Sequence, residues 1–195
     1  MELLFASGNK DKLIEVREML GNDLIKMPKD VGINDFDVVE DGKTLEENAY
    51  KKAHALYELT GKPVFADDTG LFVDSLDMRP GIYSHRYAGE NATYLDNRNK
   101  LLDELKDKSS RKACFKTVIA FIDSSANCHY FEGILNGEIT KEEKGVGDFG
   151  YDKIFLADGF SKTLAEMSVH EKNQISHRAK AMQKFKDFLG EIWRF

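Results

Sequence analysis

The sequence is poor in several residue types, and each shortage excludes a class of protein. It has only two cysteines, Cys114 and Cys128, in 195 residues. Two cysteines cannot build a disulfide framework, so we expect a reducing compartment and two thiols that act as small hydrophobic side chains. Only 3 residues are proline, and no stretch is repeated or low in complexity. This composition argues against a disordered chain and against a solenoid.

Long hydrophobic runs are missing as well. The longest run, Val118–Ile122, is too short to cross a membrane. Residues Met1–Phe5 lack a basic start followed by a long apolar stretch, so no signal peptide is expected. We therefore expect a cytoplasmic protein without a membrane partner.

The sequence also lacks an excess of positive charge. Its 28 lysines and arginines stand against 34 aspartates and glutamates, for a formal net charge of −6. A protein that grips nucleic acid nonspecifically usually has a basic face, so no nucleic-acid partner is expected. A small anionic ligand remains compatible with this charge if a few basic side chains and a divalent cation converge on it.

Hydrophobic residues make up 42% of the sequence, which is enough for one sizeable core. A buried strand at Leu3–Ala6, a tight turn and a helix at Lys10–Leu20 that ends at Gly21 are typical of the start of an α/β unit. Thr44–Glu47 matches a capping box at the start of a second helix, which Gly61 would end.

The later segments continue this mixture of strands and helices. Pro63–Ala66 predicts a buried strand that runs into a turn at Asp67–Gly70. A helix is expected over Thr93–Leu105, with Leu95 among its inward-facing residues. Further expected elements are strands at Phe115–Ile122, Tyr130–Thr140 (with a bulge at Gly133 or Gly137) and Lys153–Leu156, a capping box at Ser168–Glu171 and a last helix that reaches Ile192. Strands and helices mix throughout, so the class is α/β or α+β, of which we predict mixed α/β, in a single domain over residues 1–195.

Two segments carry the clearest candidate chemistry. Ser7–Lys12 joins a strand to a helix N-terminus, a geometry that binds phosphate, although a plain turn with solvated lysines explains the same residues. Asp67 and Asp68 follow a buried strand, where α/β proteins place functional groups. Either carboxylate could bind Mg²⁺ or take a proton from water, and an Asp-rich structural turn is the alternative.

Three other segments are weaker signals. Glu47 is either a metal ligand or the last member of the Thr44 capping box, and Lys51 and Lys52 either form a solvated face or reach a phosphate. Phe149–Asp152 either stacks on a base or plugs the core. In one continuous helix Lys172 and Ser176 share a face and His177 and Arg178 diverge from each other by about 100°. His177 and Arg178 could still line a cleft if a new helix starts at Ser176, and a helix surface with a satisfied histidine is the alternative.

Taken in order along nearly the whole chain, these segments strongly resemble the inosine triphosphate pyrophosphatase family, also called Ham1-like. The residues that carry the resemblance are Ser7–Asn9 and Lys12, Glu47–Ala49, Lys52 and Ala53, Ala66–Leu71, Pro80–Gly81, Ser84 and Arg86–Gly89, Gly150–Asp152, Ile154 and Phe155, Lys162–Thr163, Ala165–Met167, Lys172–Asn173 and Ser176–Arg178. 

The resemblance implies an elongated mixed β-sheet with flanking helices, in two lobes around a central substrate cleft, and a homodimer. It implies Mg²⁺-dependent hydrolysis of ITP, dITP and XTP to the monophosphate and pyrophosphate, which clears deaminated purines from the nucleotide pool.

The resemblance also implies roles for individual residues. Asp68 matches the proton acceptor, Glu47 and Asp68 match the Mg²⁺ ligands, and Asp67 is expected to support Asp68. The matched substrate contacts are Ser7, Gly8, Asn9, Lys10, Asp11, Lys12 and Lys52 near the phosphates, Thr69, the base-binding loop of Phe149, Gly150, Tyr151 and Asp152, and Lys172, His177 and Arg178.

Two residues depart from the family pattern, His85 where alanine is frequent and Lys153 where proline is frequent. They put loop geometry and substrate preference in doubt, but not the activity. Two rival functions are a pyrophosphatase for another modified nucleotide and a non-catalytic nucleotide sensor on the same fold. The acidic residues Glu47, Asp67 and Asp68 argue against the sensor, which has no need of them.

Overall fold

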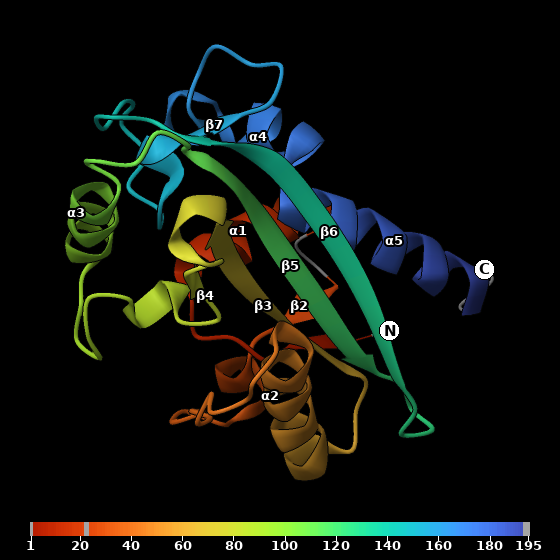
Figure 1. Ribbon diagram of the computed structural model, residues 1–195. Helices are drawn as coiled ribbons and strands as arrows, with labels where there is room; N and C mark the ends of the chain where they lie inside the picture. The colour runs from red at the N-terminus through yellow and green to blue at the C-terminus, as the bar shows by residue number, and fades with distance from the viewer. Residues whose placement is uncertain (1, 22–23, 193–195) are drawn as a thin grey trace. The chain divides into compact units, whose positions relative to one another are not determined.

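The computed structural model describes residues 2–21 and 24–192. Its strands are β1 (Leu3–Phe5), β2 (Ile25–Lys26), β3 (Val64–Val73), β4 (Pro80–Gly81), β5 (Lys112–Ile122), β6 (Cys128–Ile139) and β7 (Phe155–Ala157). Its α-helices are α1 (Lys10–Leu20), α2 (Leu45–Thr60), α3 (Tyr94–Glu104), α4 (Val169–Ile175) and α5 (His177–Ile192) (Figure 1). The predicted mixed α/β class is confirmed. No helix in the described part of the chain is long and apolar enough to span a membrane.

The strands form one mixed sheet in the order β2-β1-β3-β5-β6-β7, with β4 paired to β3 outside this path. β1 pairs in parallel with both β2 and β3, whereas β4 pairs antiparallel with β3 and β7 pairs antiparallel with β6. The parallel pairing of β1 with β3 requires a long connection, and α1 and α2 lie within it.

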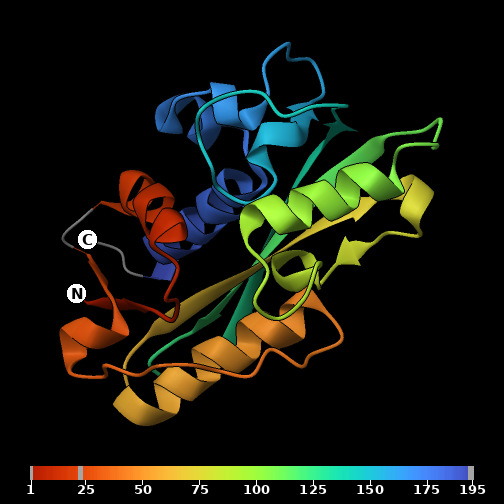
Figure 2. The same ribbon diagram turned by 90° about the vertical axis from the view of Figure 1, so that its left-hand side faces the viewer.

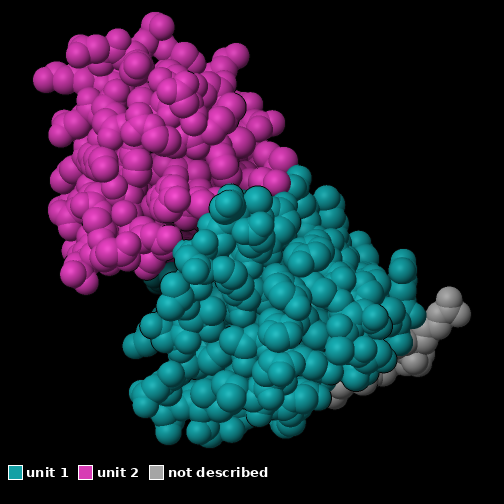
Figure 3. Space-filling model, turned by 60° about the horizontal axis from the view of Figure 1, so that its bottom comes forward, with its two compact units in different colours: residues 1–68, 117–133, 178–195 teal, residues 69–116, 134–177 magenta. Residues whose placement is uncertain are grey.

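The chain divides into two compact units, coloured separately in Figure 3. Unit 1 comprises residues 1–68, 117–133 and 178–195, and unit 2 comprises residues 69–116 and 134–177. The chain passes from one unit to the other within β3, β5 and β6 and at the junction of His177 and Arg178.

Alternate residues of β1 and β3 build two separate apolar layers in unit 1, because successive side chains of a strand point to opposite faces. Phe5 and Phe65 stack with their ring centroids 4.7 Å apart and pack with α1 and α5. Val64 and Ala66 pack instead with α2, the helix that lies against this part of the sheet (Figures 1 and 2). The α2 layer uses Ala49, Ala53 and Leu56, which recur at the helical spacing.

Several helix predictions are confirmed at their ends. α1 spans Lys10–Leu20 as predicted, and α2 begins after Thr44 and ends at Gly61 in the left-handed conformation. The capping box at Ser168 and Glu171 is present in both directions. The last helical region is not continuous, since Ser176 has an extended conformation between α4 and α5. A new helix therefore begins at His177, one residue after the start expected in the alternative with two helices.

The predicted turn at Asp67–Gly70 is wrong, because β3 continues through all four residues to Val73. Gly70 explains the error. A Cβ there would lie 2.7 Å from the Gly81 carbonyl oxygen, so this glycine allows the close approach of β4 rather than a reversal of the chain. Gly137 likewise makes room for β7, since its Cβ would lie 2.2 Å from the Leu156 carbonyl oxygen.

The prediction that Leu95 faces inward is also wrong, since 48% of the residue is exposed. α3 buries Asn97, Arg98 and Leu101 instead. Asn97 can replace an apolar residue there because its side chain bonds the Ala88 N–H and the His85 carbonyl. The strand predicted at Lys153–Leu156 begins two residues later, at Phe155, after a short 3₁₀ turn over Asp152–Ile154.

Candidate functional site

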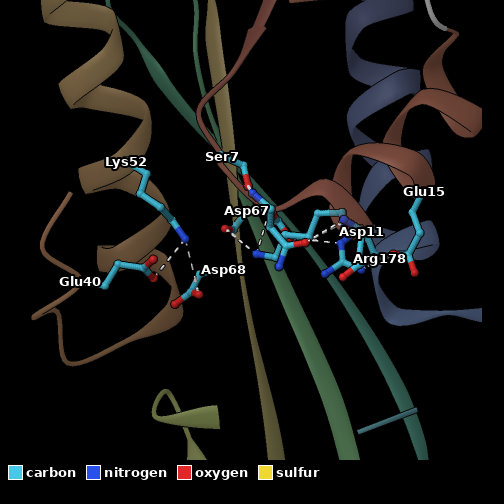
Figure 4. Close-up of polar contacts among 10 residues, drawn as sticks. Ser7, Asp11, Glu15, Glu40, Lys52, Asp67, Asp68 and Arg178 are labelled. Carbon is cyan, nitrogen blue, oxygen red and sulfur yellow. Dashed lines mark hydrogen bonds and ion pairs between the residues drawn. The ribbon is translucent and has the colours of Figure 1, made fainter. Parts of the chain in front are cut away.

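Asp67 and Asp68 lie side by side in β3, and the strand points their carboxylates in opposite directions. Asp67 continues the face of Phe65, toward α1 and α5, and Asp68 continues the face of Ala66, toward α2. Figure 4 shows the two carboxylates with separate sets of partners. The adjacent acids are therefore two sites rather than one acidic pair.

Asp67 is fully buried between two cations. The Lys12 ammonium donates to Asp67 Oδ1 at 3.0 Å, and Arg178 Nε donates to Asp67 Oδ2 at 3.1 Å. Arg178 Nη1 donates in turn to the buried carboxylate of Glu15 on α1. Lys12, Asp67, Arg178 and Glu15 thus form a continuous chain of alternating charges.

The charges in this chain fix the protonation of its members. Burial raises the pKa of Asp67, but the positive charges of Lys12, Arg178 and Lys52 outweigh burial, and the pKa lies well below the ordinary value of a carboxyl group. Burial lowers the pKa of Arg178, yet Glu15 and Asp67 reverse that effect and raise it. Asp67 is therefore a permanent anion that is committed to its partners.

Asp68 has different surroundings on the α2 face. Lys52 Nζ lies 3.6 Å from Asp68 Oδ1 and donates to Glu40 Oε2 at 3.1 Å, so one ammonium bridges the two carboxylates. Burial raises the pKa of Asp68, and the attraction of Lys52 and Lys12 does not fully offset it. Asp68 therefore has a higher proton affinity than an ordinary aspartate, as a general base requires.

Lys52 stays charged in this position. Burial lowers its pKa, but the carboxylates of Asp68 and Glu40 outweigh burial and raise the pKa above that of an ordinary lysine. Lys12 differs, because burial lowers its pKa and Asp67 offsets only part of that effect. 

The segment Ser7–Lys12 joins β1 to α1 as predicted. The Asn9 side chain caps α1, and its Oδ1 accepts from the N–H groups of Asp11 and Lys12 at 2.9 and 3.1 Å. These two N–H groups are therefore already bonded within the chain. Gly8 and Lys10 are exposed, and Ser7, Asn9 and Asp11 are half-buried.

Glu47 occupies the start of α2 with a structural bond. Its N–H donates to Thr44 Oγ1 at 3.1 Å, and its side chain accepts from the Lys43 N–H at 2.6 Å. The return bond of the predicted capping box thus reaches Lys43 rather than Thr44. A carboxylate accepts several bonds, so this contact leaves metal binding by Glu47 as a prediction.

Unit 2 holds the predicted base-binding residues. Lys172 Nζ donates to the buried carboxylate of Asp152 and lies 4.8 Å from the ring centroid of Phe149. Tyr151 is 4% exposed, and its hydroxyl donates to the Ser84 carbonyl at 2.7 Å, so it plugs the core. Gly150 has a positive φ of 53° between these aromatic residues. Phe149, Asp152 and Lys172 therefore come together, whereas Tyr151 points into the interior.

The remaining predicted contacts flank these groups along the chain. His177 is buried at the start of α5, and its ring stacks on Phe115 with a centroid separation of 4.5 Å. Thr69 follows Asp68 in β3 and is half-buried. Of the two departures from the family pattern, Lys153 forms ion pairs, and the His85 carbonyl accepts the Asn97 side chain.

Three charged residues were missed by sequence reasoning. Glu15 and Glu40 hold Arg178 and Lys52, and Arg98 is buried in α3. A signal existed for two of them. Glu15 immediately precedes the buried Val16 of its helix, and Arg98 lies about one helical turn before the buried Leu101. Glu40 had none, since it lies in an irregular segment.

The chain is similar to known proteins over almost its whole length. The sequence profile of the Ham1 family matches residues 3–188. The chain belongs to the Ham1 family. It is 45% identical over 190 residues to the dITP/XTP pyrophosphatase of Porphyromonas gingivalis, covering 96% of this chain and 97% of that protein. It is 44% identical to the protein of the same name from Flavobacterium psychrophilum, covering 97% and 99% of the two chains.

Solved structures give the same assignment to the Ham1 family. The Staphylococcus aureus Ham1 protein aligns with a TM-score of 0.88 at 39% identity, covering 98% of this chain and 99% of that one. The Mycobacterium abscessus protein described as a nucleoside-triphosphatase and dITP/XTP pyrophosphatase aligns with a TM-score of 0.76 at 34% identity, covering 95% and 98%.

Proposed function

We propose that this Ham1-family chain hydrolyses dITP, ITP and XTP to the nucleoside monophosphate and pyrophosphate, with Mg²⁺, in the cytoplasm. The relatives that carry the name dITP/XTP pyrophosphatase are similar over almost the whole length of both chains, which supports the same chemistry here. The homodimer that the resemblance implies is part of the proposal, and sedimentation of the purified chain tests it.

The contrast between Asp67 and Asp68 is the observation that carries the proposal. A hydrolase that attacks a polyphosphate with water needs a carboxylate able to take a proton, held in place by groups that do not titrate with it. Asp68 has the raised pKa, and its neighbour Asp67 is anchored by Lys12 and Arg178. A purely structural role for the two acids accounts neither for the raised pKa of Asp68 nor for the anchoring of Asp67 by two cations.

The acidic residues near Lys52 fit a magnesium ion. Mg²⁺ binds through one or two carboxylates together with substrate phosphates and water, rather than in a cage of protein ligands. Among the described residues, no group of three or more His, Cys, Asp and Glu forms such a cage. Asp68 supplies one carboxylate, and its burial favours a nearby cation.

Two glutamates are candidates for the second carboxylate. Glu47 is the one that the family resemblance selects. Glu40 is supported by geometry, because it shares the Lys52 ammonium with Asp68, whereas Glu47 caps α2. We propose Glu40 as the partner of Asp68, with Glu47 as the alternative. A bound Mg²⁺ would screen the negative charge of the phosphates and of the departing pyrophosphate.

The residues of the chain then divide the remaining work. Asp68 takes a proton from the attacking water, and Lys52 keeps the local charge favourable for anionic phosphates. Lys12 and the exposed Lys10 add positive charge at the segment Ser7–Lys12, where the triphosphate is expected. The chemistry is one of positioning and electrostatic stabilisation, and no covalent intermediate is required.

Base selection is assigned to Phe149–Asp152, Lys172, His177, Arg178 and Thr69. Hypoxanthine and xanthine carry a 6-oxo acceptor, and adenine carries a 6-amino donor. Donors aimed at position 6 would reward the former and stay unpaired against the latter, which gives strong discrimination. Arg178 donates through Nε to Asp67 and through Nη1 to Glu15, so these two bonds hold its guanidinium in place.

Product analysis tests the proposal. The purified chain is incubated with dITP, XTP and dATP in the presence of Mg²⁺, and in matched reactions with EDTA. The proposal expects monophosphate and pyrophosphate from dITP and XTP, little product from dATP and none with EDTA. Orthophosphate with the diphosphate would place the cleavage at the wrong bond. Tight binding of dITP without any product would favour the non-catalytic sensor. Turnover of other modified nucleotides alone would favour a pyrophosphatase for a different modified nucleotide.

A further inference from the structure

Arg98 is a buried guanidinium in α3 that reaches three points of one loop. Only 1% of its side chain is exposed. Nη1 donates to the Gly150 carbonyl at 2.8 Å, Nη2 donates to Asp148 Oδ1 at 2.7 Å, and Nε donates to Glu143 Oε1. These three acceptors span residues 143–150, the segment that leads into the proposed base-binding residues. A buried charge of this kind is costly unless all its partners are in place.

Lys153 reinforces the same attachment from the other end of the loop. Its ammonium lies 3.2 Å from Asp148 Oδ1, the oxygen that Arg98 also contacts, and 3.8 Å from Glu143 Oε2. Two cations and two carboxylates therefore alternate around the loop. This network gives a role to Lys153, the residue that stands where the family pattern often has proline.

The backbone around the loop is held as well, but without side-chain charge. The Lys144 N–H donates to the Lys153 carbonyl at 2.9 Å, which closes the loop at its base. A Cβ on Gly145 would lie 2.4 Å from the Ala165 carbonyl carbon, so the backbone at Gly145 lies directly against the short 3₁₀ turn Leu164–Glu166. The loop is thus fixed at its base by backbone contacts and at Gly150 by Arg98.

α3 touches the loop at a second position. Tyr94 lies one helical turn before Arg98, and its ring meets the Phe149 ring edge-on with a centroid separation of 5.9 Å. Phe149 also has the Lys172 ammonium over its ring. The face of α3 that carries Tyr94 and Arg98 therefore supports the Phe149 ring and the Gly150 carbonyl, two consecutive residues of the loop.

We infer that Arg98 is a positioning residue for substrate selection, which holds the loop 143–150 so that Phe149 presents its ring to the purine. The inference rests on the proposed function. Arginine suits this role because its planar fork serves three acceptors at once, whereas a lysine ammonium is a point charge without that geometry. Arg98 acts through the loop and touches no reacting atom.

The variants are chosen to separate positioning from general stability. Arg98→Met removes the donors and keeps much of the volume, and Arg98→Lys keeps the charge without the fork. Asp148→Asn is the milder variant, since 64% of the Asp148 side chain is exposed. Arg111→Met is the matched control. Arg111 likewise has three acceptors in unit 2, but they are the backbone carbonyls of Leu105, Ile139 and Thr140, and none lies in the loop.

Two measurements are made on each variant. Steady-state kinetics give kcat and KM for dITP and for dATP. The same assay gives the inhibition constant of inorganic tripolyphosphate, an anion that lacks a purine base. Hydrogen exchange of the substrate-free protein, followed by mass spectrometry, reports the opening of residues 144–151, which are the loop residues after Glu143 together with the adjacent Tyr151, without any need for activity.

We expect Arg98→Met and Arg98→Lys to raise KM for dITP by about tenfold and to reduce the preference for dITP over dATP, because misplacing a positioning group weakens productive binding. Inhibition by tripolyphosphate should stay within twofold of wild type, and exchange at 144–151 should rise. Asp148→Asn should give the same changes at smaller size. Arg111→Met should lower the melting temperature without changing base preference.

Unchanged exchange at 144–151 in Arg98→Met would overturn the inference, and so would an equal loss of tripolyphosphate and dITP binding. If the wild-type chain releases no pyrophosphate from dITP or XTP, the proposed function fails. The exchange measurement then still decides whether Arg98 holds the loop, so the two failures are distinguishable.

Discussion

The two faces of β3 surround neighbouring carboxylates with different partners. On the face toward α1 and α5, Asp67 is fully buried and has a direct bond to each of two cations. On the face toward α2, Asp68 is 7% exposed and its nearest lysine is 3.6 Å away and shared with Glu40. Burial acts on both carboxylates, but Asp67 has two cations in direct contact, whereas Asp68 also has the negative charge of Glu40 nearby.

This difference teaches how one dipeptide can supply both a fixed anchor and a proton acceptor. The pleat of the strand sends the two side chains into separate environments, and those environments shift the two pKa values in opposite directions. Pairs of acids with such divergent environments are characteristic of sites where one acid carries chemistry and the other supports it.

Asp68→Asn gives the largest expected effect on this comparison. The amide keeps the shape and cannot take a proton, so pyrophosphate release from dITP should fall by roughly 10²–10⁴-fold. Thermal stability should stay equal or rise at neutral pH, because folding raises the pKa of Asp68 and the ionised carboxylate opposes folding there. Calorimetry and a pyrophosphate assay on the same preparation check both. Near-full turnover would exclude Asp68 as the base.

Asp67→Asn should show the reverse pattern, with stability as its main loss. The change leaves Lys12 and the buried Arg178 without their shared anion, and breaking a buried ion pair costs about 3–5 kcal/mol. Urea unfolding measures the loss, with Asp35→Asn at an exposed aspartate as the control. A free energy of unfolding within about 0.5 kcal/mol of wild type, the usual range for surface substitutions, would contradict the anchoring role.

Glu40→Gln and Glu47→Gln sharpen the α2 side of the comparison. We expect Glu40→Gln to raise the Mg²⁺ concentration for half-maximal rate by about tenfold, as loss of a group that supports a metal does. Glu47→Gln should mainly weaken the cap on Lys43, at about 0.5–1.5 kcal/mol. Magnesium titrations of both variants decide the matter. A larger shift in Glu47→Gln would return the second carboxylate to Glu47.

The acid limb of stability gives the smallest effect. The pKa of Asp67 is lowered by folding, so its stabilising contribution is complete above about pH 4, the unfolded value, and is lost as the pH falls through the folded pKa. The pKa of Asp68 is raised, so its ionisation reduces stability as the pH rises. From pH 7 to pH 2, the difference in melting temperature between wild type and Asp67→Asn should become smaller, and most of the change should fall below about pH 4. A constant difference across that range would contradict this assignment.

Sequence reasoning located most of the elements around these carboxylates. The 3.6-residue pattern and the residues Gly21, Thr44 and Gly61 were sufficient to place α1 and α2, because caps and apolar stripes are local signals. The turn at Asp67–Gly70 was wrong because glycine in a strand and glycine in a turn look alike without the partner strand. Leu95 was wrong because α3 buries polar side chains whose partners lie elsewhere in the chain.

The site was harder to predict from the sequence than the fold. The order of motifs along the chain identified the family and named Asp68, Lys52 and Lys172. It did not reveal that Asp67 and Asp68 face opposite ways, since that follows from the continuation of β3. Glu40 and Arg98 were missed for a similar reason, because each acts through contacts with residues distant in the sequence. Glu40 contacts a residue 12 positions away, and Arg98 contacts residues about 50 positions away.

Site-resolved titration of the two carboxyl groups tests the central claim most directly. Side-chain ¹³C chemical shifts of Asp67 and Asp68 are followed against pH in the metal-free protein, with Asp67→Asn and Asp68→Asn used to assign the signals. The account predicts that Asp68 titrates above the ordinary aspartate value and that Asp67 remains ionised to well below it. Two carboxyl groups that titrate together near the ordinary value, or in the reverse order, would contradict it.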